Sequence, residues 1–254
     1  DWFRFLTAEQ GVRLGLAPNA AKLRQMLRPL IVARLVRHTP DTLISGITKL
    51  ARLHYISTKG AHALQHAGYP DLAGARRTIR DGNEILHRRG VVDIHPAVHL
   101  WTRRAGLEPE QLITDFETGS RGRVKATKLD ADPFPADALA WITGPDGKRR
   151  ALFIEFDRGG ERGDLQRVRK KWSTWRRIAT NGEVAEEMES AGGVRFLIVF
   201  KDAAFRDKAL KKWPDRNSPD WQAFFVKALP DLWADFNGGW LQPSGKTRRL
   251  FSFG

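Results

Sequence analysis

The sequence predicts a two-part α/β protein in which a small, mostly helical domain precedes a mixed sheet flanked by helices. Three observations lead to this prediction. The chain opens with a short helix, a loop and a basic helix; strand-like apolar runs alternate with helical segments afterwards; and both parts are positively charged. Alternating strands and helices are typical of layered α/β folds. We place the boundary in the Pro/Gly-containing stretch that follows Tyr69, which gives residues 1–75 and 76–254 as the domains.

Composition and charge point to a folded protein with a polyanionic partner. The 254 residues are 41% hydrophobic and include nine Trp, which is typical of a chain with a packed core. The formal net charge is +14, and the first 75 residues hold ten Lys/Arg against four Asp/Glu. Nucleic acid is the natural partner of such a charge distribution. Two alternatives are a basic protein without a nucleic-acid role and a scaffold that meets an acidic protein.

The sequence also indicates a compartment. It contains no cysteine, which excludes disulfides and thiolate zinc sites and is typical of a reducing environment. No apolar run approaches the length of about 20 residues that a bilayer-spanning helix needs, and no signal-peptide pattern is present. We therefore expect a cytoplasmic protein that is not associated with a membrane.

The first domain has the element order of a winged helix-turn-helix. We predict a helix over 7–15 capped by Thr7, an amphipathic helix over 20–28, short strands at 35–38 and 54–57, and a helix over 58–66. In a winged helix-turn-helix the second helix enters the major groove of DNA. The candidate DNA-binding residues are Lys22, Arg24, Gln25, Arg28 and Arg37. Leu23, Met26, Leu27 and Leu30 are expected on the opposite, inward face of this helix. The alternative is that the basic side is only a solvated face of a small helical domain.

The second domain is predicted as a sheet with flanking helices. The elements that we expect, in chain order, are a helix over 76–104 that Pro96 kinks or splits, a connection over 112–123, a strand over 124–129, a hairpin over 137–157, a basic helix over 161–178, a buried strand over 195–200, a helix over 206–213, a strand over 221–229 and a terminal strand near Trp240. Trp172 and Trp175, on the basic helix, are expected in the core.

The hairpin over 137–157 concentrates acidic residues. Glu155 and Asp157 are two residues apart in one strand, so both side chains point to the same face. If Thr143 pairs with Lys148, Asp137 lies opposite Ile154; a slip of one residue puts it against Glu155. Three carboxylates then converge on one patch of sheet.

Such a cluster predicts a site for Mg²⁺ or Mn²⁺, because these ions bind a few carboxylates together with water and substrate phosphate. The candidate ligands are Asp137, Glu155 and Asp157. The alternative is a solvated face whose acids pair with nearby arginines. A zinc pair at His95 and His99 has the right spacing but no accompanying glutamate motif, so packed histidines are the preferred interpretation.

These residues resemble a known family. Asp137, the Phe-Ile-Glu-Phe-Asp-Arg-Gly segment over 153–159 and the basic helix that follows are similar to the replication-relaxation family of plasmid proteins, which includes MobC-type relaxases. The segments Tyr55–Ala61, His87 with Val92-Asp93, and Lys171–Trp175 are similar too. The resemblance implies a winged-helix domain joined to a PD-(D/E)XK nuclease-like domain.

The same resemblance implies site roles. Asp137 and Glu155 take the place of metal ligands, whereas Asp157 stands where many PD-(D/E)XK nucleases have lysine. That lysine orients water and offsets charge in the transition state, which an aspartate does not do. Asp157 is then left to bind a second ion, and Lys171, or else Lys170, is the candidate to supply the cation from the following helix. The candidate catalytic residues are therefore Asp137, Glu155, Asp157 and Lys171.

Two functions follow as hypotheses. The first is a metal-dependent DNA nickase or endonuclease of plasmid replication or mobilisation, which acts on double-stranded DNA. The second is a non-catalytic DNA-binding accessory factor. A second copy of the chain and other relaxosome or replication proteins are further candidate partners. A tyrosine relaxase is disfavoured, because the only tyrosines, Tyr55 and Tyr69, lie in the first domain and no His-x-His cluster is present.

Overall fold

The computed structural model describes residues 5–39, 43–44, 48–49, 52–69, 82–107, 109–114, 136–159, 166–180 and 182–252. The chain divides into two compact units, Asp1–Pro96 and Ala97–Gly254. The division falls within a helix, whereas the predicted boundary between residues 75 and 76 lies outside the described residues. Among the described helices, none is both long and apolar enough to cross a membrane.

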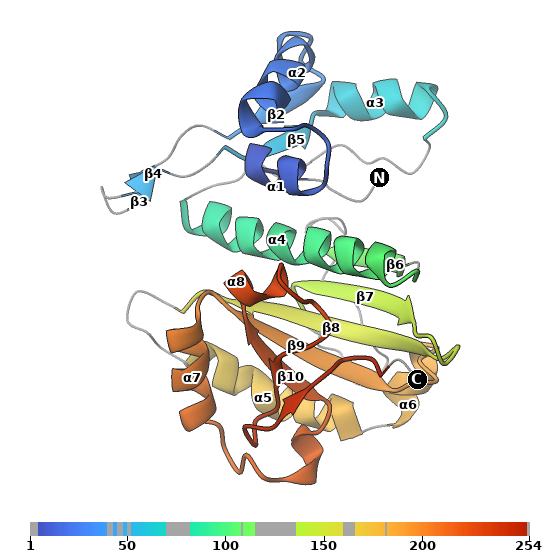
Figure 1. Ribbon diagram of the computed structural model, residues 1–254, viewed down its shortest axis with the longest axis vertical. Coiled ribbons are helices and arrows are strands. Elements are labelled where there is room, and N and C mark those ends of the chain that lie inside the picture. Colours follow the sequence, from blue (N-terminus) through green and yellow to red (C-terminus); the bar gives the residue numbers. More distant parts are fainter. Residues whose placement is uncertain are drawn as a thin grey trace. The chain divides into compact units, whose positions relative to one another are not determined.

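Unit 1 consists of short helices and a small antiparallel sheet (Figure 1). Its elements are β1 (Phe5–Leu6), α1 (Ala8–Arg13), α2 (Ala20–Val32), β2 (Val36–His38), β3 (Leu43–Ile44), β4 (Thr48–Lys49), β5 (His54–Ile56), α3 (Thr58–His66) and the first part of α4 (Gly82–Arg104). The sheet has the strand order β1-β5-β2, and β3 pairs with β4. This agrees with the predicted order of helices and strands; its identification as a winged helix remains a proposal.

Local capping explains where the first helices begin. Thr7 caps α1 through a capping box: its hydroxyl accepts from the backbone N–H of Gln10, and the Gln10 side chain accepts from the Thr7 N–H. Asn19 caps α2 by accepting from the Lys22 N–H. Gln10 Nε2 also donates to Asp93 of α4 over 2.9 Å. One buried amide therefore joins α1 to the first part of α4.

The predicted buried face of α2 is only partly buried. Leu23 packs with Ala8 and Ala17, but Met26 is 50% exposed and Leu30 is 40% exposed. The prediction was wrong for these two residues because α1, with six residues, covers only a narrow strip of α2. The apolar stripe on the helix is wider than the surface it packs against.

Unit 2 is built on a seven-stranded mixed sheet with the strand order β12-β11-β10-β9-β8-β7-β6. Its elements after α4 are β6 (Pro109–Thr114), β7 (Ala138–Thr143), β8 (Arg149–Asp157), α5 (Gln166–Thr180), α6 (Gly182–Glu187), β9 (Val194–Phe200), α7 (Ala203–Lys211), the short 3₁₀ helix η2 (Pro219–Trp221), β10 (Phe224–Ala228), α8 (Leu229–Leu232), β11 (Trp240–Leu241) and β12 (Thr247–Arg248). Strands β8, β9 and β10 run parallel, and the other neighbours are antiparallel. The predicted α/β fold with a mixed sheet and flanking helices is confirmed.

Aromatic packing holds α5 against one face of this sheet. The Phe196 ring stacks on Phe153 and Phe224, with centroids 5.2 and 4.7 Å away, and Trp175 of α5 adds a third contact at 6.1 Å. Trp172 stacks on Trp213 at 4.4 Å. Both α5 tryptophans are buried, as predicted.

Several predicted boundaries differ from the structure. The edge strand β6 occupies a segment that we assigned in part to a connection; its proline is tolerated because it stands at the first position of an edge strand. The strand predicted over 124–129 lies outside the described residues. Helix α4 continues through Pro96 without a break. Helix α7 begins at Ala203, three residues before the predicted start, because Asp202 caps it by accepting from the Phe205 N–H.

Candidate functional site

The β7–β8 hairpin places Asp137 beside Glu155. Thr143 pairs with Arg149 and Ala138 with Ile154, which is the register shifted by one residue from the Thr143–Lys148 pairing. The reason is the turn, in which Gly147 adopts a positive φ of 68° and five residues separate the paired positions. Asp137, one residue before Ala138, therefore stands opposite Glu155. Its Oδ2 accepts a hydrogen bond of 2.8 Å from the Phe156 N–H.

Glu155 is a buried carboxylate in the interior of the sheet. Its strand β8 lies between β7 and β9, and the residue is only 9% exposed. The Oε2 atom is buried and accepts no hydrogen bond from the part of the chain that the structure describes. A buried carboxylate oxygen without a donor is unfavourable for folding, which makes Glu155 a candidate for a role other than stability.

Lys171 of α5 lies against this carboxylate. Its Nζ forms an ion pair with Glu155 Oε1, and the lysine side chain is 16% exposed. The ammonium also lies 5.8 Å from the centre of the Trp175 ring, an arrangement that favours a cation. Among the two lysines considered from sequence, the structure thus brings Lys171 to the acids. The side chain of Lys170 lies outside the described residues.

Asp157 is the last residue of β8. Its Oδ1 accepts a hydrogen bond of 2.8 Å from the Gly159 N–H, and Gly159 has a positive φ of 67°. The carboxylate thereby stabilises the turn that ends β8. Asp157 faces the same side of the sheet as Glu155, so its charge acts on that carboxylate as well.

The surroundings of Glu155 combine burial, two neighbouring acids and one lysine. Burial raises the pKa of Glu155 well above its ordinary value, and the negative charges of Asp137 and Asp157 raise it further. The Lys171 ammonium acts in the opposite direction, by its charge and by its hydrogen bond. A carboxyl group with two like charges and one opposite charge nearby is typical of sites that bind cations or transfer protons.

The donor set agrees with a hard divalent cation of the Mg²⁺ class. Among the described residues, no three His, Asp or Glu side chains form a ready-made metal group. Mg²⁺ does not require one, because it commonly binds one or two carboxylates and takes its other ligands from water and substrate phosphate. Glu155 Oε2, buried and without a donor, and the neighbouring Asp137 carboxylate are the oxygens that fit such an ion.

The predicted DNA-binding residues of unit 1 are all exposed. Four lie on α2 and Arg37 lies on β2; the full set is Lys22, Arg24, Gln25, Arg28 and Arg37. Arg24 forms an ion pair of 2.9 Å with Glu9, and the Lys22 ammonium donates to Gln25 Oε1 over 3.2 Å. These contacts are at the surface and so are weak enough to exchange for contacts with a phosphate or a base.

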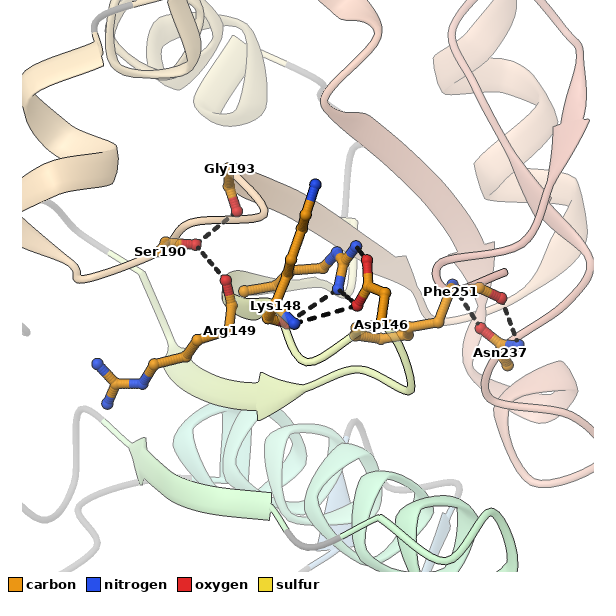
Figure 2. Close-up of polar contacts among 8 residues, drawn as sticks. Asp146, Lys148, Arg149, Ser190, Gly193, Asn237 and Phe251 are labelled. Carbon is orange, nitrogen blue, oxygen red and sulfur yellow. Dashed lines mark hydrogen bonds and ion pairs between the residues drawn. The ribbon is translucent and has the colours of Figure 1, made fainter. Parts of the chain in front are cut away.

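A basic cluster at the start of β8 was missed from sequence. The Arg150 guanidinium binds Asp146, with an Nη1–Oδ1 distance of 2.8 Å, and lies over the Phe251 ring at 5.4 Å. Arg195 lies over the same ring at 5.3 Å. Figure 2 shows Asp146 turned toward the Lys148 backbone and Phe251 held by both groups of the Asn237 amide. No local pattern connects Phe251 to a turn about one hundred residues earlier, so the sequence carried no signal for it.

Comparisons with known proteins add no assignment. Neither family models, nor curated proteins, nor solved structures gave a significant match to this chain. The geometry around Glu155 is therefore the main indication of function.

Proposed function

We propose that the protein binds double-stranded DNA and that unit 2 nicks or cleaves it with the help of a divalent cation. The observation that carries the proposal is the approach of Lys171 to a buried Glu155, next to Asp137 and Asp157. Buried acids with one cation at the end of a strand are the arrangement used for phosphodiester hydrolysis by PD-(D/E)XK nucleases, which the sequence resembles. Here the lysine comes from α5 instead of from the strand.

Each residue has a distinct role in this proposal. Asp137 and Glu155 hold the cation, for which Glu155 Oε2 is already desolvated. A bound Mg²⁺ or Mn²⁺ polarises the phosphate and lowers the pKa of an attacking water. Lys171 offsets negative charge at the scissile phosphate, which is where a cation stabilises the transition state most. Asp157 keeps the end of β8 in place through the Gly159 N–H.

DNA binding is assigned to unit 1 on the basis of charge and exposure. Exposed basic and amide side chains on α2 suit a helix that contacts phosphates and base edges. Arg28 and Arg37 supplement Arg24 with positive charge. The identification of unit 1 as a winged helix-turn-helix, and of the protein as a replication or mobilisation factor, forms part of this proposal.

A non-catalytic DNA-binding accessory factor is the second candidate, and one observation favours it. The Lys171 ammonium already neutralises Glu155, so the buried acid is tolerated without any metal. In this case DNA binding depends steeply on salt, decreases in Arg24→Ala/Arg28→Ala and is unaffected by Glu155→Gln.

The test is the conversion of supercoiled plasmid to the open-circle or linear form in Mg²⁺ or Mn²⁺. The wild type is compared with Glu155→Gln, Asp137→Asn and Lys171→Met, and we expect each variant to be slower by a factor on the order of 100 or more. Glu189→Gln is the matched control, because Glu189 pairs with Arg149 at the surface and is 81% exposed. Absence of cleavage with either ion, or equal cleavage by wild type and Glu155→Gln, would contradict the enzymatic proposal.

A further inference from the structure

A pocket lies on the side of α5 that faces the end of α7 and η2, entirely within unit 2. Its volume is about 640 Å³, in the range of small-molecule sites. Six residues define its chemistry: Trp172, Ser173, Arg176, Arg177, Lys212 and Trp221. None of them belongs to the acidic group around Glu155.

The floor of the pocket is apolar and firmly packed. Trp172 and Trp221 are each only 3% exposed. Trp213 joins them, stacking on Trp172 at 4.4 Å and meeting the Trp221 ring edge-on at 5.5 Å. The Trp221 indole N–H donates to the Asp215 carbonyl over 3.1 Å. A floor held by these contacts does not need to rearrange when a ligand binds.

Arg176 is held in a fixed position at the wall. Its Nε donates to Asp220 over 2.6 Å, and the guanidinium lies over the Trp221 ring at 5.5 Å. The side chain is nevertheless 44% exposed, and it lines the pocket. A guanidinium with one side covered by an indole still offers a flat surface and N–H donors, which suit a planar base and a phosphate respectively.

The charge of the wall selects an anion. Arg176, Arg177 and Lys212 place three positive charges at the pocket, and Asp220 pairs with Arg176. Arginine and lysine are the side chains that proteins use most for phosphate, and Ser173 adds a hydroxyl at the pocket. The volume exceeds the requirement of a phosphate ion alone, and the apolar floor suits a larger group attached to it.

We propose that this pocket binds a nucleotide unit, that is, a base with its sugar phosphate. Two sources have the same chemistry: a free mononucleotide, and one nucleotide of a single-stranded DNA segment. The proposal concerns binding and does not depend on cleavage at Glu155.

The experiment is isothermal titration calorimetry of the full chain with dTMP, dAMP, inorganic phosphate and a 5′-phosphorylated oligo(dT). Two variants change the pocket in different ways. Ser173→Trp fills it and keeps every charge, whereas Lys212→Glu keeps the space and reverses one charge at the wall. Lys246→Glu is the control, since it makes the same charge change on the exposed turn between β11 and β12. Thermal melts establish that all variants are folded.

We expect nucleotide affinity to fall by about tenfold or more in both pocket variants and to stay unchanged in Lys246→Glu. Binding of dTMP or dAMP with this pattern identifies a free nucleotide as the ligand. Binding of the oligonucleotide alone, with the same pattern, identifies a DNA strand. The proposal is overturned if no nucleotide binds, if inorganic phosphate binds as tightly as dTMP, or if Ser173→Trp binds like the wild type.

Discussion

The two ends of strand β8 carry opposite charges, and these charges lie in different environments. At its start, Arg150 pairs with Asp146 on an exposed turn and rests on the Phe251 ring. Near its end, Glu155 is buried with two further acids nearby and one lysine as its partner. The first arrangement is what a stable turn requires. Stability alone does not explain the pair of Glu155 and Lys171, since a buried ion pair commonly stabilises a protein no more than an apolar pair of the same size.

The two ends of β8 show which charged groups in this fold are candidates for a functional role. Charged groups that have surface partners and aromatic support need no further explanation. A buried carboxylate with an oxygen that lacks a donor, held close to like charges, is a candidate functional group. Four variants test this difference between the two ends of β8.

The largest effect is expected for Lys171→Met. Removal of the ammonium leaves Glu155 buried between Asp137 and Asp157 without a cation. Loss of one partner of a buried pair destabilises a protein by about 3–5 kcal/mol. Urea denaturation followed by tryptophan fluorescence measures this change. A loss below about 1 kcal/mol would mean that the pair is effectively solvated.

The double variant Glu155→Leu/Lys171→Met should recover most of that loss. Both charges are removed together, and apolar side chains of similar size replace them. We expect an unfolding free energy within about 1 kcal/mol of the wild type or above it, together with loss of plasmid nicking. A double variant as unstable as Lys171→Met would instead assign the pair a structural role.

Arg150→Ala at the other end of the strand should be milder. It removes one cation–π contact and an ion pair in which the Arg150 side chain is 12% exposed and the Asp146 side chain 41%. It also relieves repulsion with Arg195. The expected destabilisation is about 1 kcal/mol, with nicking per folded molecule unchanged. Thermal unfolding and the plasmid assay measure the two quantities. A loss of nicking comparable to that of Glu155→Gln would remove the distinction between the two ends.

Asp146→Asn should have the smallest effect and a defined pH dependence. The hydrogen bond from Arg150 lowers the pKa of Asp146 below its ordinary value of 3.8. A carboxylate with a lowered folded-state pKa contributes stability above the unfolded-state pKa, and the contribution disappears as pH falls through the folded-state value. The difference in Tm between wild type and Asp146→Asn should therefore be present at pH 6 and shrink below about pH 4. A constant difference would show that the charge is not responsible.

Sequence reasoning performed well where the information was local. The turn at Gly147, the alternation of β8 and the cap at Thr7 each depend on a few neighbouring residues, and the observed hairpin register is one of the two that were considered. The choice of Lys171 comes from the family resemblance, which implies a cation near the acids and covers the segment Lys171–Trp175 on the helix after the acidic strand. The structure brings its ammonium to Glu155.

The remaining features depend on distant parts of the chain. The exposure of Met26 depends on the shortness of α1, and a hydrophobic pattern along α2 alone does not contain that fact. The pocket needs Trp172 and Trp221, which are almost 50 residues apart and both pack against Trp213. The stacking of Arg150 and Arg195 on Phe251 is likewise a product of tertiary packing.

Anomalous scattering from crystals grown with Mn²⁺ tests the proposal that Asp137 and Glu155 hold a divalent cation. In the wild type we predict an anomalous peak within coordination distance of both carboxylates. In Glu155→Gln we predict no peak at that position. Crystals of wild-type protein without that peak, obtained at a Mn²⁺ concentration that supports plasmid nicking, would contradict the claim.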